Sequence, residues 1–299
     1  MTSEEKLDYL AGFFDADGSI SSSSSGGRHR ICLTVAQCTP TVPRIYKSLF
    51  GGRIYPVVHN NKNWRDAWIW QLHYTHNCEF GHSMWKRIVI KRRQLELAVR
   101  LGESRKTYGE GKRYRPVTPS GIAYRDSLLE MLKGLNGGKF DNEPVQLWDQ
   151  SIAYWAGLFD GDGTIQLNKD HTSRIYRPAV RLYSVYKPIL FAAQNQFGGF
   201  VRPSIKSGRC GSWEASNRAS EGFLRKIEPF LIEKKDRCQK SVRISDLIRN
   251  GEKVLVPKKK HAVWMWPNSM IEQMNSLVQE FKVLNRRGIM RGIAFEEAT

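Results

Sequence analysis

The feature that most constrains this chain is an internal repeat. Residues 7–20 read LDYLAGFFDADGSI, and residues 152–165 read IAYWAGLFDGDGTI, 145 positions further along a chain of 299 residues. A repeat spaced by about half the length indicates one duplicated structural unit rather than two unrelated domains. We therefore expect a first half over residues 1–136, a linker over 137–150 and a second half over 151–299.

The segments that follow the two copies also correspond to each other. Alternating apolar residues predict a strand after each copy, over 28–37 and over 176–184. Each strand leads to a helix that has an early proline and ends in Phe-Gly-Gly, over 43–50 and 188–197. The remaining predicted strands span 53–58 and 67–73 in the first half and 200–205 and 212–217 in the second. A basic helix follows over 85–97 in the first half and over 223–248 in the second. A late helix is predicted over 127–136 and over 276–285. The five serines at 21–25 predict a mobile loop.

Each copy of the repeat is an apolar helical segment that ends in acidic residues and a glycine. A small residue lies four positions after Gly12, and another lies four positions after Gly157. Because residues four apart share one helix face, the backbones of two such helices can approach closely. That packing would place Asp17 beside Asp162, where two carboxylates repel unless a divalent cation lies with them. Oxygen ligands with open water positions suit Mg²⁺ on a phosphate substrate, and such a site can hydrolyse a phosphodiester. The alternative is that these aspartates only cap neighbouring backbone.

An EF-hand is excluded at both copies. Such a loop requires glycine at its sixth position and glutamate at its twelfth. Counted from Asp15, those positions hold Ile20 and Gly26; counted from Asp160, they hold Ile165 and His171.

The charge of the chain points to a polyanion. The net charge is +18, with an excess of +7 in residues 1–150 and of +11 in residues 151–299. Because both halves are positive, nucleic acid is the partner that we expect, although a basic protein without that role remains the alternative. No apolar stretch predicts a membrane span, and no signal peptide is evident. Five widely spaced cysteines without a C-x-x-C pair predict free thiols in a reducing, intracellular compartment.

The two repeated segments resemble the signature of the LAGLIDADG homing endonucleases, in the single-chain form that carries two copies. The resemblance covers nearly the whole chain and implies an α+β fold of two pseudo-symmetric αββαββα halves. In that fold the motif helices meet at a central interface and two antiparallel sheets form a DNA-binding saddle. The implied activity is metal-dependent hydrolysis of both strands of a long, asymmetric DNA site, leaving short 3′ overhangs.

The resemblance also implies roles for particular residues. Asp17 and Asp162 match the catalytic, metal-binding acids, and the carbonyls of Ala16 and Gly161 match a further metal contact. Asp15 and Asp160 match an acid that is usually structural. Lys91 and Lys234 match lysines near the reacting water, with Lys235 as a competitor, and Gln37 matches a polar residue that orients water, with its counterpart near Ser184. Mg²⁺ is the expected ion, and Mn²⁺ should replace it because both accept six oxygen ligands. For the lysines and Gln37, the alternative is ordinary solvent exposure.

The predicted strands carry candidate DNA contacts on the face opposite their apolar residues. Arginines at alternating strand positions can reach base edges, with guanine as the commonest target. The candidates are Arg28, Arg30, Thr34 and Tyr55 in the first half and Arg177, Arg181 and Arg202 in the second. Because the two sets differ, they predict an asymmetric target; the alternative is a solvent-facing strand surface. Basic clusters at Arg105, Lys106, Lys112, Arg113, Arg115 and Lys258–Lys260 are expected to contact phosphates.

One further cluster, His73, His76, Cys78 and His82, lacks a standard zinc spacing and is interpreted as ordinary loop polarity.

From the repeat, the charge and the resemblance together, we expect a monomeric, intron-encoded, site-specific endonuclease of double-stranded DNA, with no membrane partner. An organellar setting (mitochondrion or chloroplast) is common in the family. The alternatives are a maturase that binds its own intron RNA and a non-catalytic DNA-binding regulator; the presence of both Asp17 and Asp162 argues against the regulator.

Overall fold

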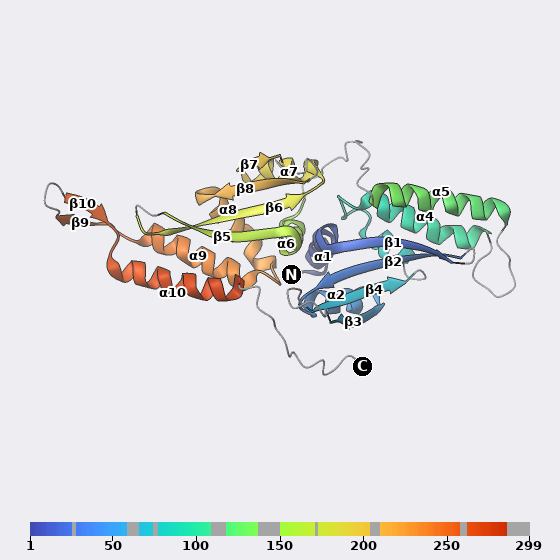
Figure 1. Cartoon of the computed structure of the whole chain (residues 1–299), viewed down its shortest axis with the longest axis horizontal. Coiled ribbons are helices and arrows are strands. Elements are labelled where there is room, and N and C mark those ends of the chain that lie inside the picture. Colours follow the sequence, from blue (N-terminus) through green and yellow to red (C-terminus); the bar gives the residue numbers. More distant parts are fainter. Residues whose placement is uncertain are drawn as a thin grey trace. The chain divides into compact units, whose positions relative to one another are not determined.

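The computed structural model describes residues 1–25, 28–58, 66–73, 77–108, 118–136, 150–170, 173–203, 210–257 and 262–285 (Figure 1). They form two compact units, within Met1–Gly161 and within Asp162–Gly288. The helix of the second motif copy thus belongs to the first unit up to its penultimate residue. Residues 137–149 of the predicted linker lie outside the described residues.

The first unit contains a four-stranded antiparallel sheet of order β1-β2-β4-β3. Its elements in chain order are α1 (Ser3–Asp17), β1 (Gly18–Ser25), β2 (Arg28–Gln37), α2 (Thr41–Phe50), β3 (Arg53–Val57), β4 (Ala67–His73), α3 (Asn77–Met84), α4 (Arg92–Tyr108), α5 (Pro119–Asn136) and α6 (Ile152–Asp162).

The second unit repeats this plan with a sheet of order β5-β6-β8-β7, and it adds a β9-β10 hairpin that the sequence did not predict. Its elements are β5 (Gly163–Lys169), β6 (Tyr176–Ser184), α7 (Lys187–Phe197), β7 (Phe200–Arg202), β8 (Gly211–Ser216), α8 (Asn217–Ile227), η1 (Glu228–Phe230), α9 (Lys235–Asn250), β9 (Val254–Pro257), β10 (Ala262–Met265) and α10 (Asn268–Asn285).

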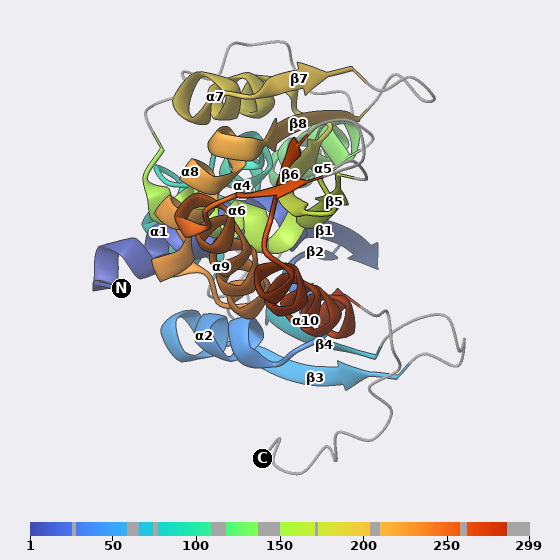
Figure 2. The ribbon, with the colours of Figure 1, turned by 90° about the vertical axis from the view of Figure 1, so that its left-hand side faces the viewer.

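Strand pairing is equivalent in the two sheets. Val35 of β2 lies between Gly18 and Trp70, and Leu182 of β6 lies between Gly163 and Trp213. One face of each sheet is apolar and buried, because residues at alternate strand positions point to the same side. In the first unit α2 packs against β4 and β3, and in the second α7 packs against β8 and β7 (Figure 2). The predicted α+β class with two antiparallel sheets is confirmed.

Three predicted elements were wrong. The serine run is not a loop but the end of β1, where Ser21 pairs with Cys32 and Ser25 with Arg28; the ladder to β2 outweighs the low strand preference of serine. The predicted helix over 85–97 is helical only from Arg92, where α4 begins, because residues 85–91 form a non-helical connection after α3. The predicted helix over 223–248 is broken at Pro229, which has no N–H and cannot continue α8 into α9.

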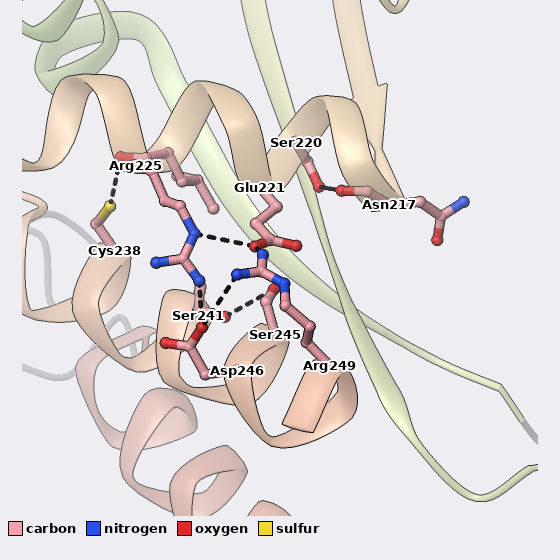
Figure 3. Close-up of polar contacts among 10 residues, drawn as sticks. Asn217, Ser220, Glu221, Arg225, Cys238, Ser241, Ser245, Asp246 and Arg249 are labelled. Atoms are coloured by element: carbon pink, nitrogen blue, oxygen red, sulfur yellow. Dashed lines mark hydrogen bonds and ion pairs between the residues drawn. The ribbon is translucent and has the colours of Figure 1, made fainter. Parts of the chain in front are cut away.

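Ion pairs join α8 to α9 in the second unit (Figure 3). Glu221 accepts from Arg225 at 2.9 Å and also pairs with Arg249, while Asp246 pairs with both arginines. The Cys238 thiol of α9 points to the Leu224 carbonyl of α8 at 3.5 Å. These contacts fix the helix pair that supports the buried face of the β5–β8 sheet. Across the described ranges, no helix combines the length and apolar character needed to span a membrane.

Candidate active site

The two motif helices pack together within the first unit. A Cβ atom at Gly12 would overlap the backbone of Tyr154, and one at Gly157 would overlap the backbone of Tyr9. Only glycine permits this approach. Two hydrogen bonds repeat across the contact: the Tyr9 hydroxyl donates to Asp160 Oδ2 at 2.7 Å, and the Tyr154 hydroxyl donates to Asp15 Oδ2, also at 2.7 Å.

Asp15 is buried, and its side chain binds a backbone segment that is distant in sequence. Its carboxylate accepts the backbone N–H groups of Val89 (2.7 Å), Ile90 (3.1 Å) and Lys91 (2.8 Å), directly before α4. A side chain from α1 therefore holds the non-helical segment that leads into α4. These backbone contacts explain why the predicted helix over 85–97 begins only at Arg92. Burial raises the pKa of Asp15, although the amide and Tyr154 hydrogen bonds and the Lys91 ammonium oppose the shift.

Asp17 is the last residue of α1 and is partly exposed. Gln37, at the end of β2, places its Nε2 atom 3.4 Å from Asp17 Oδ2. The amide oxygen of Gln37 accepts from the Cys38 N–H at 2.8 Å, which orients the amide with its nitrogen toward Asp17. The structure thus brings together two of the predicted site residues, and leaves the carboxylate accessible beside a polar group.

Lys91 lies at the same end of α1. Its ammonium donates to the carbonyls of Phe14 (2.9 Å), Asp15 (2.8 Å) and Ala16 (3.0 Å). A cation at these carbonyls is stabilised by the negative end of the helix dipole. The Ala16 carbonyl therefore already accepts one hydrogen bond, and its second lone pair is what a metal would use. Lys91 precedes α4 rather than lying within a helix.

Gly161 brings α6 close to this end of α1. A Cβ atom at Gly161 would overlap the Cβ of Ala16 and lie 3.2 Å from Asp17 Oδ2. Gly161 is thus next to Ala16 and to the Asp17 carboxylate within the first unit. The described residues contain no group of three or more His, Cys, Asp or Glu side chains that could hold a metal ion. A cation here would need backbone carbonyls, water and substrate oxygens as further ligands.

In the second unit, Asp162 ends α6 and Lys234 is the buried residue that precedes α9, the position that Lys91 has before α4. Strand register aligns Ser184 with Gln37, since each lies two residues after the position paired with the motif glycine. The Ser184 hydroxyl accepts from the Tyr186 N–H at 3.1 Å. Burial, and then the charge of Asp162, raise the pKa of the Cys210 thiol.

The candidate DNA contacts lie on the open faces of the two sheets. Tyr55, Arg177 and Arg202 are exposed, and Thr34 and Arg181 are partly exposed. Sequence reasoning missed Glu214, which lies on the same face of the second sheet and pairs with Arg181 and Arg202. The alternation of residues in the predicted strand 212–217 indicates that this side chain lies on the open face, but it does not predict the ion pairs.

Several predicted residues lie outside what the structure describes. Only the backbone of Arg28 and Arg30 is described, and the same holds for Arg105, Lys106 and Cys78; Lys112, Arg113, Arg115, Lys258–Lys260 and His76 are not described at all. Of the histidine cluster, His73 ends β4 and His82 lies 3.5 Å from Glu103.

Comparison with known proteins gives two results. Residues 4–37 match the family model of the LAGLIDADG-like domain. No curated protein matches the chain significantly.

Three solved structures illustrate the fold match, and all three are LAGLIDADG endonucleases with DNA. I-GzeII in complex with its DNA target has a TM-score of 0.67 at 12% identity, over 91% of this chain and 96% of that one. I-LtrWI bound to target DNA gives 0.66 at 14% identity, over 93% and 97%. I-AabMI bound to uncleaved DNA gives 0.64 at 15% identity, over 96% and 99%. Residues 4–37 are therefore similar in sequence to a LAGLIDADG-like domain, and more than nine-tenths of the chain shares its fold with a LAGLIDADG homing endonuclease.

Proposed function

We propose that this chain is a site-specific endonuclease of double-stranded DNA that hydrolyses both strands of a long, asymmetric target with the help of divalent metal ions. The observation that carries the proposal is the end of α1. There, the accessible Asp17 carboxylate lies 3.4 Å from the Gln37 amide, with the Lys91 ammonium on the neighbouring carbonyls. The matched structures with DNA support the substrate class.

The donor set at this end of α1 fits Mg²⁺. Asp17 supplies carboxylate oxygens, and Ala16 and Gly161 supply carbonyls. Mg²⁺ prefers oxygen ligands and is commonly held by one or two carboxylates together with water and substrate phosphates, so a cage of three or more side chains is not required. When bound, such an ion lowers the pKa of water and stabilises the charge on the leaving oxygen. Asp162 is proposed as the equivalent ligand in the second half, and Mn²⁺ should serve in place of Mg²⁺.

The neighbouring residues have proposed roles that follow from their contacts. Gln37 can hold a water molecule through its amide, because its orientation is fixed by the Cys38 N–H. Lys91 fixes the end of α1 through three carbonyls, and its positive charge favours a phosphate nearby. Lys234 is proposed to act in the same way in the second half. Asp15 supports the site indirectly, since its carboxylate accepts the backbone N–H of Lys91 and so holds that residue in place.

DNA binding is proposed for the open faces of both sheets. The net charge of +18, with both halves positive, supplies the attraction to phosphates. Thr34 and Tyr55, together with Arg28 and Arg30, would contact one part of the target, and Arg177, Arg181 and Arg202 another. We further propose that the protein acts as a monomer, that it is intron-encoded, and that it works in a reducing compartment. The four cysteines whose side chains are described form no disulfide.

A cleavage assay tests the proposal. Wild-type protein is incubated with a randomised DNA library and Mg²⁺, and the new ends are sequenced to find the site and its overhangs. The variants Asp17→Asn and Asp162→Asn are then assayed on that site. Each should lower double-strand cleavage by about a thousandfold or more, because several kcal/mol of transition-state stabilisation are lost. Binding without metal should persist.

The matched control is Asp126→Asn, which removes the same charge from an exposed position on α5. It should cleave like wild type. Absence of cleavage by the wild type with either Mg²⁺ or Mn²⁺ would refute the endonuclease proposal. Binding of intron RNA by a protein that does not cleave DNA would favour a maturase. Full cutting by Asp17→Asn would refute the role of that residue.

A further inference from the structure

Three charged residues form a linked group on the open face of the second sheet. Glu214 lies on β8, directly across from Arg181 on β6 and from Phe200 on β7. Arg181 Nε lies 3.1 Å from Glu214 Oε1, and Arg202 Nε lies 3.3 Å from Oε2. The Ser212 hydroxyl donates to Oε1 at 3.3 Å. One carboxylate therefore holds two arginines from the strands on either side of it.

The exposure of these side chains shows which of them can reach a ligand. The Glu214 side chain is 13% exposed, whereas Arg181 is 38% and Arg202 61% exposed. Both ion pairs use Nε, so the terminal Nη groups form the remaining donor edge of each guanidinium. The Arg202 guanidinium also lies over the Phe200 ring, 4.7 Å from its centroid. The carboxylate is thus sheltered, while both arginine side chains remain partly or largely exposed beside it.

We propose that Glu214 is a positioning residue that aims Arg181 and Arg202 at two guanines in the part of the DNA target read by the second sheet. This inference rests on the proposed function. Arginine contacts guanine through two parallel hydrogen bonds to O6 and N7, which requires a defined guanidinium plane. Without the carboxylate, two adjacent cations repel and their long side chains regain rotamer freedom, so that plane is lost.

A direct reading of a base by Glu214 is the competing interpretation. A carboxylate can accept from the N4 amino group of cytosine. Here Oε1 forms an ion pair with Arg181 and accepts a hydrogen bond from Ser212, Oε2 forms an ion pair with Arg202, and little of the side chain is exposed. Orientation of the arginines therefore accounts for the contacts better than direct readout.

The first sheet has no such group at the equivalent positions. Register aligns Gln71 with Glu214 and Thr34 with Arg181, because Thr34 pairs with Gln71 as Arg181 pairs with Glu214. The Gln71 amide donates to Cys32 Sγ at 2.8 Å. The side chains of Thr34, Gln71 and Cys32 form no charged pair. The paired-guanine preference is therefore confined to one side of the target.

A binding selection tests the inference. Full-length protein is selected against a randomised double-stranded DNA library in EDTA, so that metal-dependent cleavage does not contribute, and bound sequences are counted. Wild type, Glu214→Gln, Arg181→Ala and Arg202→Ala are compared at one salt concentration. Glu252→Gln, which removes an exposed negative charge from the same unit, is the matched control. Thermal melts establish that each variant is folded.

Wild type should prefer guanine at two positions of the target. Arg181→Ala should lose the preference at one of these positions, and Arg202→Ala should lose it at the other. Glu214→Gln should lose guanine preference at both, roughly 5- to 150-fold over the next base, with other positions unchanged. A uniform loss at all positions would show a merely structural role, and a lost cytosine preference would show direct readout; either overturns the inference. If Glu214→Gln keeps both guanines, the inference fails while the proposed function stands. No sequence preference in the wild type would overturn both.

Discussion

The open faces of the two four-stranded sheets carry different side chains, although the sheets share strand order and register. In the second sheet, Arg181 lies opposite Glu214 and forms an ion pair with it. In the first sheet, the equivalent pair is Thr34 opposite Gln71, and the amide bonds to a thiol. The buried faces, in contrast, are alike: Trp70 and Trp213 occupy equivalent positions and are both fully buried.

The same contrast holds along the motif helices. Gly12 and Gly157 make reciprocal close contacts, and Tyr9 and Tyr154 make reciprocal hydrogen bonds. Beyond the helix ends the likeness stops: Asp17 lies near the amide of Gln37, whereas Asp162 lies near the thiol of Cys210. Residues that pack are alike in the two copies and residues that face outward differ, as expected if packing constrains both copies equally and each outward face meets a different part of an asymmetric ligand.

The largest expected effect concerns the reciprocal glycines. Gly12→Ala and Gly157→Ala should each lower the free energy of unfolding by about 3 kcal/mol, because the added methyl group overlaps backbone that cannot move aside. The measurement is urea unfolding followed by circular dichroism. The control is Gly134→Ala on α5, where a Cβ meets nothing within 4 Å, and which should gain about 0.5–1 kcal/mol from helix propensity. A large loss of unfolding free energy at one glycine and none at the other would show that the two helices are not equivalent in this contact.

An intermediate effect is expected from moving the charged pair to the first sheet. The double variant Thr34→Arg, Gln71→Glu places arginine and glutamate in the register that Arg181 and Glu214 have. It should gain a guanine preference of about tenfold at a new position of the selected target, the size of one good bidentate contact. The single variant Thr34→Arg is the control, and should gain less because its guanidinium is not held. Equal gains in both variants would contradict the positioning role of the carboxylate.

The smallest expected effect concerns the surroundings of the second motif acid. Burial and the charge of Asp162 raise the pKa of the Cys210 thiol. In Asp162→Asn the thiolate no longer meets that negative charge, so the Cys210 pKa should fall and alkylation at a fixed pH below it should become faster. Rates of labelling by iodoacetamide, resolved by peptide mass spectrometry, measure the change. Asp236→Asn is the control; an unchanged Cys210 pH profile in Asp162→Asn would show that the two groups do not interact.

Much of the fold was predictable because its signals are local. Alternation of apolar residues predicted β2 and β6 with their observed bounds, and Pro and Gly punctuation predicted α2 and α7 within two residues at their starts. The repeat predicted two sheets of one kind. The failures also have local causes. A serine run carries no apolar alternation, so the end of β1 was predicted to be a loop. A basic apolar stretch does not show that Asp15 will bind the backbone before α4 and delay the start of that helix.

The sequence by itself determined the duplicated fold, the buried faces of its sheets and the candidate acids Asp17 and Asp162, because periodicity and motif spacing are properties of neighbouring residues. The tertiary structure decided how distant residues act on one another. Only folding places Lys91 on the carbonyls at the end of α1, Asp15 on the first amides before α4, and Glu214 between arginines from two other strands. These contacts join segments far apart in the chain, and their geometry depends on how helices and strands pack rather than on any local pattern.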